Sequence, residues 1–313
     1  MKKIPTILGS DEMLDKAFRR VKKVRVTDQR GLKRSKAEAV GKVNSLVNTL
    51  AAQLNKYVKA FPSIDRLHPF ERELIDVVVG VDRLKHSLGA LDWARKTMEG
   101  IKREERDAIK KAGGADEVGK RQNAVFGRVS SVMDKVAGDL EFLKGARHKL
   151  KSIPDIRPDE PIVVIAGAPN VGKSLIVRQI SSGKPEIASY PFTTKNVSLG
   201  HMMVKRRRVQ VMDTPGLLDR PLEERNPIEL QAVAALQHLE GVFVFVFDPS
   251  ETCGYSLDSQ RNLLKELKMS FPETEFIIVS NKSDLQASAE GIGVSAKTGA
   301  GIGHLLSAIE GLI

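Results

Sequence analysis

Residues 162–180 read IVVIAGAPNVGKSLIVRQI, and this stretch decides the fold of the second half of the 313-residue chain. The apolar run 162–166 is typical of a buried strand. The segment 167–174 after it fits the phosphate-binding loop pattern G-x-x-x-x-G-K-[ST] at every fixed position. Glycine lets backbone N–H groups turn inward around a phosphate, and the N-terminus of a following helix adds positive potential. The stretch therefore predicts a strand, a nucleotide-binding loop and a helix in succession.

Two residues of the loop have separate predicted roles. Lys173 would neutralise the β- and γ-phosphates of a bound triphosphate, and Ser174 would present its hydroxyl to Mg²⁺. The loop residues expected to contact the nucleotide are Ala168, Pro169, Asn170, Val171, Gly172, Lys173, Ser174 and Leu175.

The segment 209–216 reads VQVMDTPG, a predicted strand that ends in the pattern D-x-x-G. Asp213 would hold the Mg²⁺ shell, and the amide of Gly216 would sense the γ-phosphate. Three further motif residues, Phe192, Thr193 and Thr194, lie in residues 190–195 (YPFTTK), where a switch threonine is expected. We favour Thr194 over Thr193 as the switch residue whose hydroxyl reaches Mg²⁺ only with GTP bound. The alternative is a polar loop that leads into a strand. The predicted catalytic residues are Lys173, Thr194 and Gly216, and the predicted metal ligands are Ser174, Thr194 and Asp213.

Two later motifs select the base. Residues 281–284 (NKSD) follow an apolar run and fit N-K-x-D. The carboxylate of Asp284 can accept from both the ring N–H and the amino group of guanine, and adenine offers no such pair of donors. Residues 295–297 (SAK) fit the loop whose backbone donates to the guanine O6. The expected ligand is therefore GTP or GDP, bound at its base by Asn281, Lys282, Asp284, Ser295, Ala296 and Lys297.

The pattern of the first half is helical instead. Apolar residues recur at three- and four-residue steps over 35–61, and further helical runs cover about 81–112 and 118–150. Ser35 with Glu38 resembles a capping box, and Trp93 is expected in the core of an antiparallel bundle. Two prolines within residues 152–158 stop the last helix and favour an extended linker.

After this linker, short β-rich runs alternate with amphipathic helices, which predicts a mostly parallel sheet covered on both faces. The expected strands are 161–168, 197–204, 207–213, 242–248, 276–280 and 292–295, and the expected helices are near 174–180, 227–239, 257–269 and 302–309. The expected organisation is an α/β chain with a helical domain over 1–152, a linker over 153–160 and a GTPase domain over 161–313.

Composition narrows the class of protein. The chain is 41% hydrophobic and 28% charged, as in ordinary globular proteins. Its apolar runs, such as 241–247, are far shorter than the ~20 residues of a membrane-spanning helix, so no membrane association is expected. The N-terminus has no signal-peptide pattern, and the single cysteine, Cys253, excludes an internal disulfide. These features predict a cytoplasmic protein.

The positive charge lies entirely in one half of the chain. Residues 1–150 hold 33 Lys and Arg against 20 Asp and Glu, whereas residues 151–313 hold 17 against 19. The segment 1–36 alone has twelve basic and four acidic residues. A solvated helix face is the ordinary explanation of a charge run, but this imbalance favours a separate module that binds a polyanion through its phosphates. The basic run 205–208 is expected at an exposed hairpin tip.

Several strings resemble a known family. GAPNVGKS, YPFTT and DTPGLLDRPLEERN (213–226) together resemble the Obg group of GTPases. The last string, with SETCGYSL (250–257), is most similar to the nucleolar GTP-binding protein family. The resemblance extends to the first half through LDKAFRR (14–20), FPSID with HPF (61–70) and IPDI (153–156), so it spans nearly the whole chain.

The resemblance implies a helical bundle followed by a Ras-like P-loop GTPase domain. It implies action in large ribosomal subunit assembly, with ribosomal RNA, the large-subunit precursor and ribosomal proteins as partners. Longer, eukaryotic members have a large C-terminal extension, so this chain looks like a compact archaeal form.

Matched positions imply two features of the mechanism. Leu217 stands where Ras-type proteins have a water-orienting glutamine, so intrinsic hydrolysis is expected to be slow. Asn170 stands where K⁺-dependent relatives use an asparagine, so K⁺ is a candidate cofactor beside Mg²⁺, although asparagine also suits a turn.

Two alternatives stay open. The chain could be an RNA-binding assembly scaffold in which nucleotide is structural and turnover is negligible. It could also be a GTPase that acts on another RNA or on a membrane-associated complex. The sequence leaves the oligomeric state open.

Overall fold

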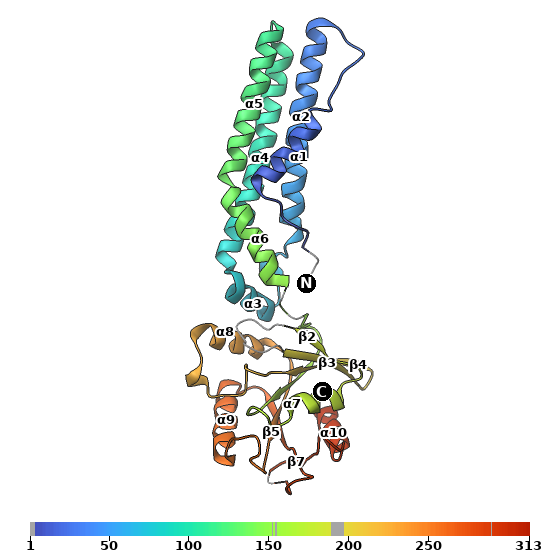
Figure 1. Cartoon of the computed structure of the whole chain (residues 1–313), viewed down its shortest axis with the longest axis vertical. Helices are drawn as coiled ribbons and strands as arrows, with labels where there is room; N and C mark the ends of the chain where they lie inside the picture. The colour runs from blue at the N-terminus through green and yellow to red at the C-terminus, as the bar shows by residue number, and fades with distance from the viewer. Residues whose placement is uncertain (1–3, 152, 154, 189–196, 289) are drawn as a thin grey trace. The chain divides into compact units, whose positions relative to one another are not determined.

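A computed structural model covers the whole chain and describes residues 4–151, 153, 155–188, 197–288 and 290–313. The chain divides into two compact units (Figure 1). The helical unit comprises Met1–Arg66 and Val79–Lys151, and the sheet unit comprises Leu67–Val78 and Ser152–Ile313. The segment Leu67–Val78 lies within the range expected for the helical domain, yet it packs in the sheet unit because Phe70 and Leu74 are buried in that unit's core.

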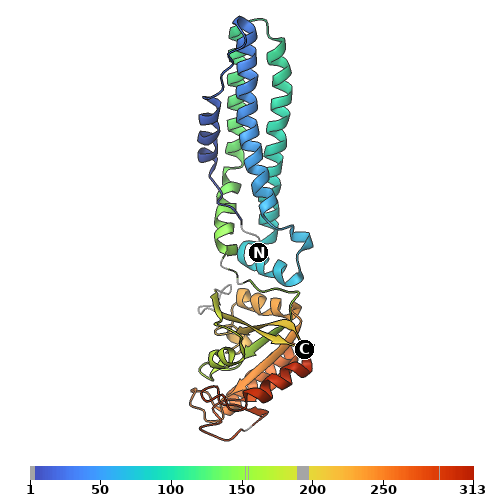
Figure 2. The ribbon, with the colours of Figure 1, turned by 90° about the vertical axis from the view of Figure 1, so that its right-hand side faces the viewer.

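Three long helices of the helical unit run side by side (Figure 1), and the short helix α1 lies along their flank (Figure 2). The ring of Phe18 in α1 meets the ring of Phe126 in α5 edge to face, with 5.5 Å between centroids. The helices bury one apolar stripe each, as residues spaced three and four apart share a face. The elements of this unit are α1 (Ser10–Val21), α2 (Gly31–Ala60), a 3₁₀ turn (Ile64–Arg66), α4 (Val81–Lys111), α5 (Ala115–Lys135) and α6 (Ala137–Lys151).

The single helix predicted over 118–150 is wrong. The chain forms two helices there, α5 and α6, which are separated at Val136, where φ is −104° and ψ is 7°. Asp139 in the first turn of α6 is buried and accepts a hydrogen bond from the Ser87 hydroxyl of α4 at 2.8 Å. This tertiary contact fixes the start of α6. The three- and four-residue spacing of apolar residues continues across Val136, so the sequence pattern does not show that the helix ends there.

Two local predictions in the helical unit are also wrong. Ser35 does not cap a helix, because α2 begins at Gly31, and the Glu38 carboxylate pairs with Arg34 at 3.0 Å. Trp93 is not a core residue, since its side chain is 46% exposed and carries the Lys135 ammonium over its ring. The apolar pattern of α4 is satisfied by Leu84 and Leu91, which are fully buried.

The sheet unit has one seven-stranded sheet with the order β2-β3-β4-β1-β5-β6-β7. Strands β4, β1, β5, β6 and β7 are parallel neighbours, whereas β2, β3 and β4 pair antiparallel. The mostly parallel sheet that the sequence predicts is therefore confirmed. The strands are β1 (Ile162–Ala166), β2 (Glu186–Ala188), β3 (Val197–Val204), β4 (Arg207–Asp213), β5 (Gly241–Phe247), β6 (Glu275–Ser280) and β7 (Ile292–Gly293).

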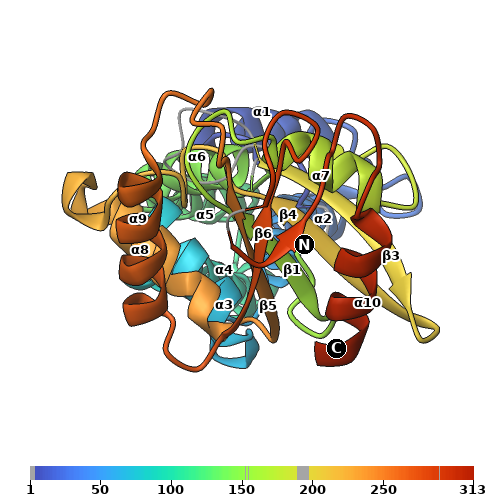
Figure 3. The same cartoon turned by 90° about the horizontal axis from the view of Figure 1, so that it is seen from below.

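Helices cover both faces of this sheet. Figure 3 shows α8 and α9 on one side and α7 and α10 on the other. Two apolar cores result, one on each face, and α3 joins the core under α8 and α9. The helices are α3 (Pro69–Val79), α7 (Lys173–Ile180), α8 (Pro227–Ala235) and its 3₁₀ extension (Leu236–His238), α9 (Leu257–Ser270) and α10 (Ile302–Leu312), with a further 3₁₀ turn at Leu222–Glu224.

The sequence prediction missed β2 in this unit. Its described residues, Glu186–Ala188, pair with β3 at the edge of the sheet, and three residues are too few for a detectable alternation of apolar residues. Among the described residues, no helix combines the length and the apolar character needed to cross a membrane.

Candidate nucleotide-binding site

The loop between β1 and α7 requires glycine at two positions. Gly167 has a φ of 137°, and a Cβ on it would come within 2.5 Å of the Val246 carbonyl oxygen. Gly172 has a φ of 100°, and a Cβ there would overlap the Asn281 side-chain amide. An L-residue with a side chain is strained in this region of φ and would also collide with its neighbours. The loop can therefore turn tightly and lie against the end of β5 and the N-K-x-D segment only with glycine at both places.

This loop encloses a cavity of about 390 Å³ at the carboxyl ends of the parallel strands, which is where open α/β sheets bind ligands. Lys173 is almost fully buried, and its ammonium donates to the carbonyl oxygens of Gly167 and Ala168 at 2.8 Å each. These contacts hold the ammonium inside the loop, where an incoming phosphate would replace neutral acceptors with a charged one. The cavity is lined by Pro169, Asn170, Gly172, Lys173, Ser174, Leu175, Pro215 and Asp219.

Asp213 and Ser174 meet beside this cavity. The Ser174 hydroxyl donates to Oδ2 of Asp213, and Oδ1 is buried with no hydrogen-bond partner within the described residues. Burial raises the pKa of the Asp213 carboxyl, and the Ser174 hydroxyl and the Lys173 charge offset that effect only in part. A buried carboxylate oxygen without a partner, next to a hydroxyl, is the type of donor set that hard cations such as Mg²⁺ prefer. Both residues therefore fit the predicted metal site.

The D-x-x-G segment adds a residue that the sequence analysis did not identify. The Gly216 amide donates to Oδ2 of Asp219 at 2.7 Å, and Asp219 lines the cavity. Leu217, by contrast, is 1% exposed and packs in the core under α8 and α9. In the sequence, the only indication of Asp219 is that an acidic residue stands three positions after the motif glycine. A single acidic residue at that spacing does not show which group it contacts.

The N-K-x-D segment is tied directly to the phosphate loop. The Asn281 side chain donates to the Val171 carbonyl oxygen at 2.7 Å and accepts from the Ala296 amide at 2.9 Å. One asparagine thus joins the phosphate loop, the end of β6 and the segment 295–297. The parallel pairing of β1, β5 and β6 makes this possible because their carboxyl ends lie at one edge of the sheet.

The predicted base-contacting residues lie together beyond Asn281. The Ser295 hydroxyl donates to Oδ1 of Asp284 at 2.6 Å, and this hydrogen bond lowers the pKa of the Asp284 carboxyl below its ordinary value. Ser295 and Ala296 are buried, whereas Lys297 is exposed. A lowered pKa favours the ionised carboxylate, which is the form that could accept from two guanine donors.

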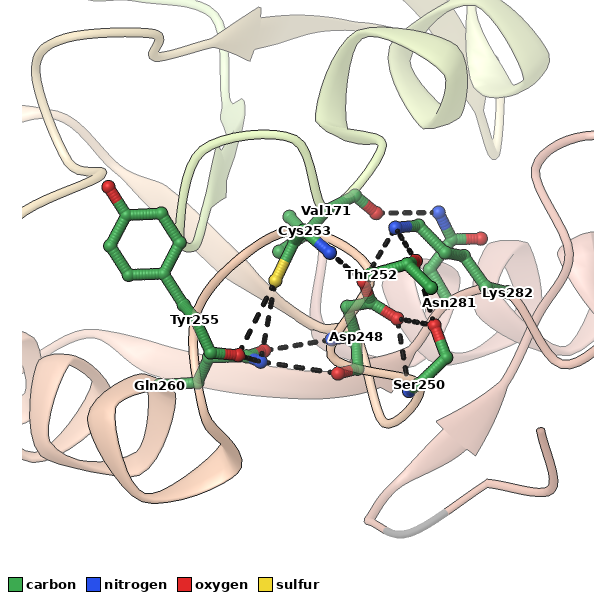
Figure 4. Close-up of polar contacts among 9 residues, drawn as sticks. All are labelled: Val171, Asp248, Ser250, Thr252, Cys253, Tyr255, Gln260, Asn281 and Lys282. Atoms are coloured by element: carbon green, nitrogen blue, oxygen red, sulfur yellow. Dashed lines mark hydrogen bonds and ion pairs between the residues drawn. The ribbon is translucent and has the colours of Figure 1, made fainter. Parts of the chain in front are cut away.

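A buried carboxylate, Asp248 at the end of β5, supports Lys282 (Figure 4). The Lys282 ammonium lies 2.5 Å from Oδ2 of Asp248 and donates to the Thr252 hydroxyl at 2.7 Å. Burial opposes ionisation of Asp248, but hydrogen bonds from Lys282, Ser250 and the Cys253 amide outweigh it and lower the pKa of the carboxyl. Lys282 has a φ of 59°, a conformation that persists only where contacts hold it. No sequence motif predicts the contact between Asp248 and Lys282, which are 34 positions apart.

Three predicted site residues, Phe192, Thr193 and Thr194, lie outside the described residues. The structure brings the remaining predicted residues together at one edge of the sheet. Asn170, the candidate K⁺ contact, lines the cavity with a φ of 61°, a left-handed conformation that asparagine tolerates in turns.

Two family models and the named sequence relatives identify one family. The model of the NOG1 N-terminal helical domain matches residues 1–157, and the model of nucleolar GTP-binding protein 1 matches residues 227–284. An uncharacterised protein of Methanocaldococcus jannaschii is 40% identical over 91% of this chain and 81% of its own length. Nucleolar GTP-binding protein 1 of Candida glabrata is 34% identical over 91% of this chain, and that of Drosophila melanogaster is 35% identical over 88%.

The alignments cover 44% of the Candida protein and 42% of the Drosophila protein, so the chain spans less than half the length of these relatives. A crystal structure of a candidate nucleolar GTP-binding protein 1 from Plasmodium falciparum is 32% identical, with a TM-score of 0.45 over 51% of this chain and 89% of that one.

Proposed function

The chain belongs to the nucleolar GTP-binding protein 1 family, and we propose that it is a GTP-binding and GTP-hydrolysing switch that acts in assembly of the large ribosomal subunit. In this proposal, the sheet unit binds and hydrolyses GTP, and the basic helical unit binds ribosomal RNA. Its expected setting is the cytoplasm.

One observation carries the nucleotide part of the proposal. Asn281 of the predicted guanine motif donates a hydrogen bond to the Val171 carbonyl oxygen of the phosphate loop, so the predicted phosphate-binding and base-binding segments are in direct contact. GTP and GDP are the ligands that such a site fits, because Asp284 is aligned as a double acceptor by Ser295. Calorimetry should detect binding of GDP and no comparable binding of ADP. Equal heats for the two nucleotides would contradict the proposal.

Hydrolysis is expected to be slow without a partner. Mg²⁺ held by Ser174, Asp213 and Thr194 would supply positive charge to the phosphates, and Lys173 would supply more from inside the loop. Leu217 faces the core and cannot orient a water molecule. Position 217 therefore supplies no group that orients the attacking water, and we expect the assembling ribosome or K⁺ beside Asn170 to supply such a group. Equal GTP turnover in KCl and NaCl would remove K⁺ from this account.

Exposed cations of the helical unit that have no ion pair among the described residues favour the proposal that this unit binds RNA. Lys22, Lys23, Arg30 and Lys33 lie on and after the α1–α2 connection, are exposed, and make no ion pair within the described part of the chain. In α4 and α5, by contrast, exposed cations such as Arg128 pair with neighbouring carboxylates. Unpaired cations attract phosphate without first losing an internal partner, so the α1–α2 connection is the part of this unit we expect to contact RNA.

This contact can be tested on the full chain with structured ribosomal RNA. Lys22→Gln combined with Lys23→Gln should weaken binding and lower the slope of log affinity against log salt by about one for each phosphate that the variant no longer neutralises. The matched control, Arg128→Gln, removes a cation that is already paired and should leave the slope unchanged. Binding that is indifferent to ionic strength would contradict an RNA-binding helical unit.

The main competitor is an RNA-binding scaffold in which the nucleotide is structural. Single-turnover hydrolysis with and without large-subunit precursor particles separates the two functions. We expect the particles to accelerate hydrolysis. Tight GTP binding with no turnover in either condition would favour the scaffold.

A further inference from the structure

Gly216 is held at both of its polar groups by side chains of its own segment. Its amide donates to Oδ2 of Asp219 at 2.7 Å, and its carbonyl oxygen accepts from the Arg225 guanidinium at 3.5 Å. Its φ of 77° is a conformation that glycine adopts freely, so its peptide groups can reorient at low cost. Side chains of the segment 216–225 therefore hold Gly216 in place, including the amide that is expected to sense the γ-phosphate.

The placement of Asp219 is unusual for a phosphate site. Its side chain is 6% exposed and lines the cavity together with Lys173 and Ser174. A carboxylate in this cavity repels phosphate, and it also occupies the hydrogen-bond donor that the terminal phosphate needs. A diphosphate has no terminal γ-phosphate and does not compete for this amide.

We propose that Asp219 is a specificity-determining residue that discriminates against the γ-phosphate, so that the chain rests in its diphosphate-type state until GTP displaces this carboxylate from the Gly216 amide. The inference rests on the proposed GTP-binding function and adds a residue outside its motifs. Binding of GTP must exchange one charged acceptor for another on a single N–H group. The exchange separates two discrete states of the segment, as a switch requires.

Arg225 offers the displaced carboxylate a new partner. It is 7% exposed, its Nε is buried with no hydrogen-bond partner in the described part of the chain, and its Nη2 donates to the Arg220 carbonyl oxygen at 2.8 Å. Burial lowers the pKa of the Arg225 guanidinium, and the negative charge of Asp219 opposes that effect. A buried donor without an acceptor is costly, so the Nε of Arg225 is a favourable partner for a carboxylate that leaves the Gly216 amide.

The test measures equilibrium affinity for GDP and for β,γ-imido-GTP, a non-hydrolysable analogue, at fixed Mg²⁺. Asp219→Ala removes the competing acceptor and its charge, and it should raise affinity for the analogue about tenfold with GDP affinity unchanged. Asp219→Asn keeps an acceptor oxygen but removes the charge, so its gain should be smaller, about threefold. The exposed Glu223→Gln is the matched control, because it neutralises one charge of the same segment without touching Gly216, and it should change neither affinity.

The outcomes separate this inference from other roles of Asp219. A loss of affinity for both nucleotides in Asp219→Ala would mean that the carboxylate holds the metal, and unchanged analogue affinity with slower hydrolysis would mean that it orients the attacking water. Either result overturns the proposal. Thermal unfolding of each variant verifies that it is folded. If the wild-type chain binds neither nucleotide, the proposed function itself fails; if it binds both and Asp219→Ala leaves their ratio unchanged, only the role of Asp219 fails.

Discussion

The base side and the phosphate side of the candidate site are built differently. On the base side, the polar side chains already have their partners: Asn281 bonds in two directions, Asp284 accepts from Ser295, and Lys282 pairs with Asp248. On the phosphate side, Oδ1 of Asp213 is buried without a partner among the described residues, and the Gly216 amide is held by a carboxylate.

This difference separates recognition from switching. A preorganised base side requires little rearrangement on binding, so it should contribute equally to GDP and GTP affinity. The phosphate side exchanges partners when a phosphate and a metal enter, so its contribution should depend on the γ-phosphate. The ratio of the affinities for β,γ-imido-GTP and GDP measures how far the two sides differ.

The largest effect is expected on the phosphate side, from Lys173→Ala. Loss of the buried ammonium removes charge-assisted hydrogen bonds to phosphate and should lower the affinity for β,γ-imido-GTP on the order of a thousandfold, with a smaller loss for GDP. Titration calorimetry measures both. Arg178→Ala, an exposed cation on the same helix, is the control and should bind both nucleotides as the wild type does. A Lys173→Ala loss that is equal for the two nucleotides would contradict the division.

Asp284→Asn should have the next largest effect, on the base side. The amide presents a donor to the guanine donors, so affinity for GDP and for the GTP analogue should fall together by about a hundredfold, and preference should shift toward xanthine nucleotides. Competition binding with GDP, β,γ-imido-GTP and the two corresponding xanthine nucleotides measures this shift. Unchanged guanine affinity would remove Asp284 from the site.

Asp248→Asn should weaken GDP and GTP-analogue binding equally, by about tenfold, because Lys282 loses the charge that orients it. Combining Asp248→Asn with Lys282→Met tests whether Asp248 affects nucleotide affinity through Lys282. If Asp248 acts through Lys282, adding Asp248→Asn to Lys282→Met causes no further loss of affinity. Additive losses would show that Asp248 supports the fold in another way.

The pH dependence of stability gives a second measurement on Asp248. Its pKa is lowered in the folded chain, so the stability it contributes is present above the unfolded-state pKa of about 3.9 and is lost as the pH falls through the folded-state pKa. The wild type should therefore unfold at a higher temperature than Asp248→Asn at neutral pH, and the gap should narrow in acid below about pH 4. A gap that widens in acid would contradict the assignment.

Ser295→Ala should have the smallest effect. The variant loses one hydrogen bond to Asp284, and the carboxylate remains able to accept from guanine, so both affinities should fall only about threefold. Measurement of nucleotide dissociation rates resolves a change of this size. A loss of affinity for β,γ-imido-GTP without a loss for GDP would mean that Ser295 affects binding of the γ-phosphate rather than of the base.

Much of this site could be predicted from the sequence because its parts are local. The glycines at 167 and 172, the lysine beside them and the order of the four motifs each follow from short segments with one chemical requirement. The same holds for the alternating strands and helices of the sheet unit. The helix break at Val136, the exposure of Trp93 and the placement of Leu67–Val78 could not be predicted this way, because packing partners distant in sequence decide them.

By itself, the sequence determined which half of the chain carries the positive charge and which segments are expected to bind phosphate and guanine. Only the tertiary structure showed that Asp219 holds the Gly216 amide, that Asp248 holds Lys282 and that Leu217 turns into the core. The physical reason is that a motif specifies residue types along the backbone, whereas the partner of a polar group depends on which loops the sheet brings to the same edge. Parallel strands bring together loops that are as much as 110 residues apart in the chain, and only their packing decides which acceptor each donor finds.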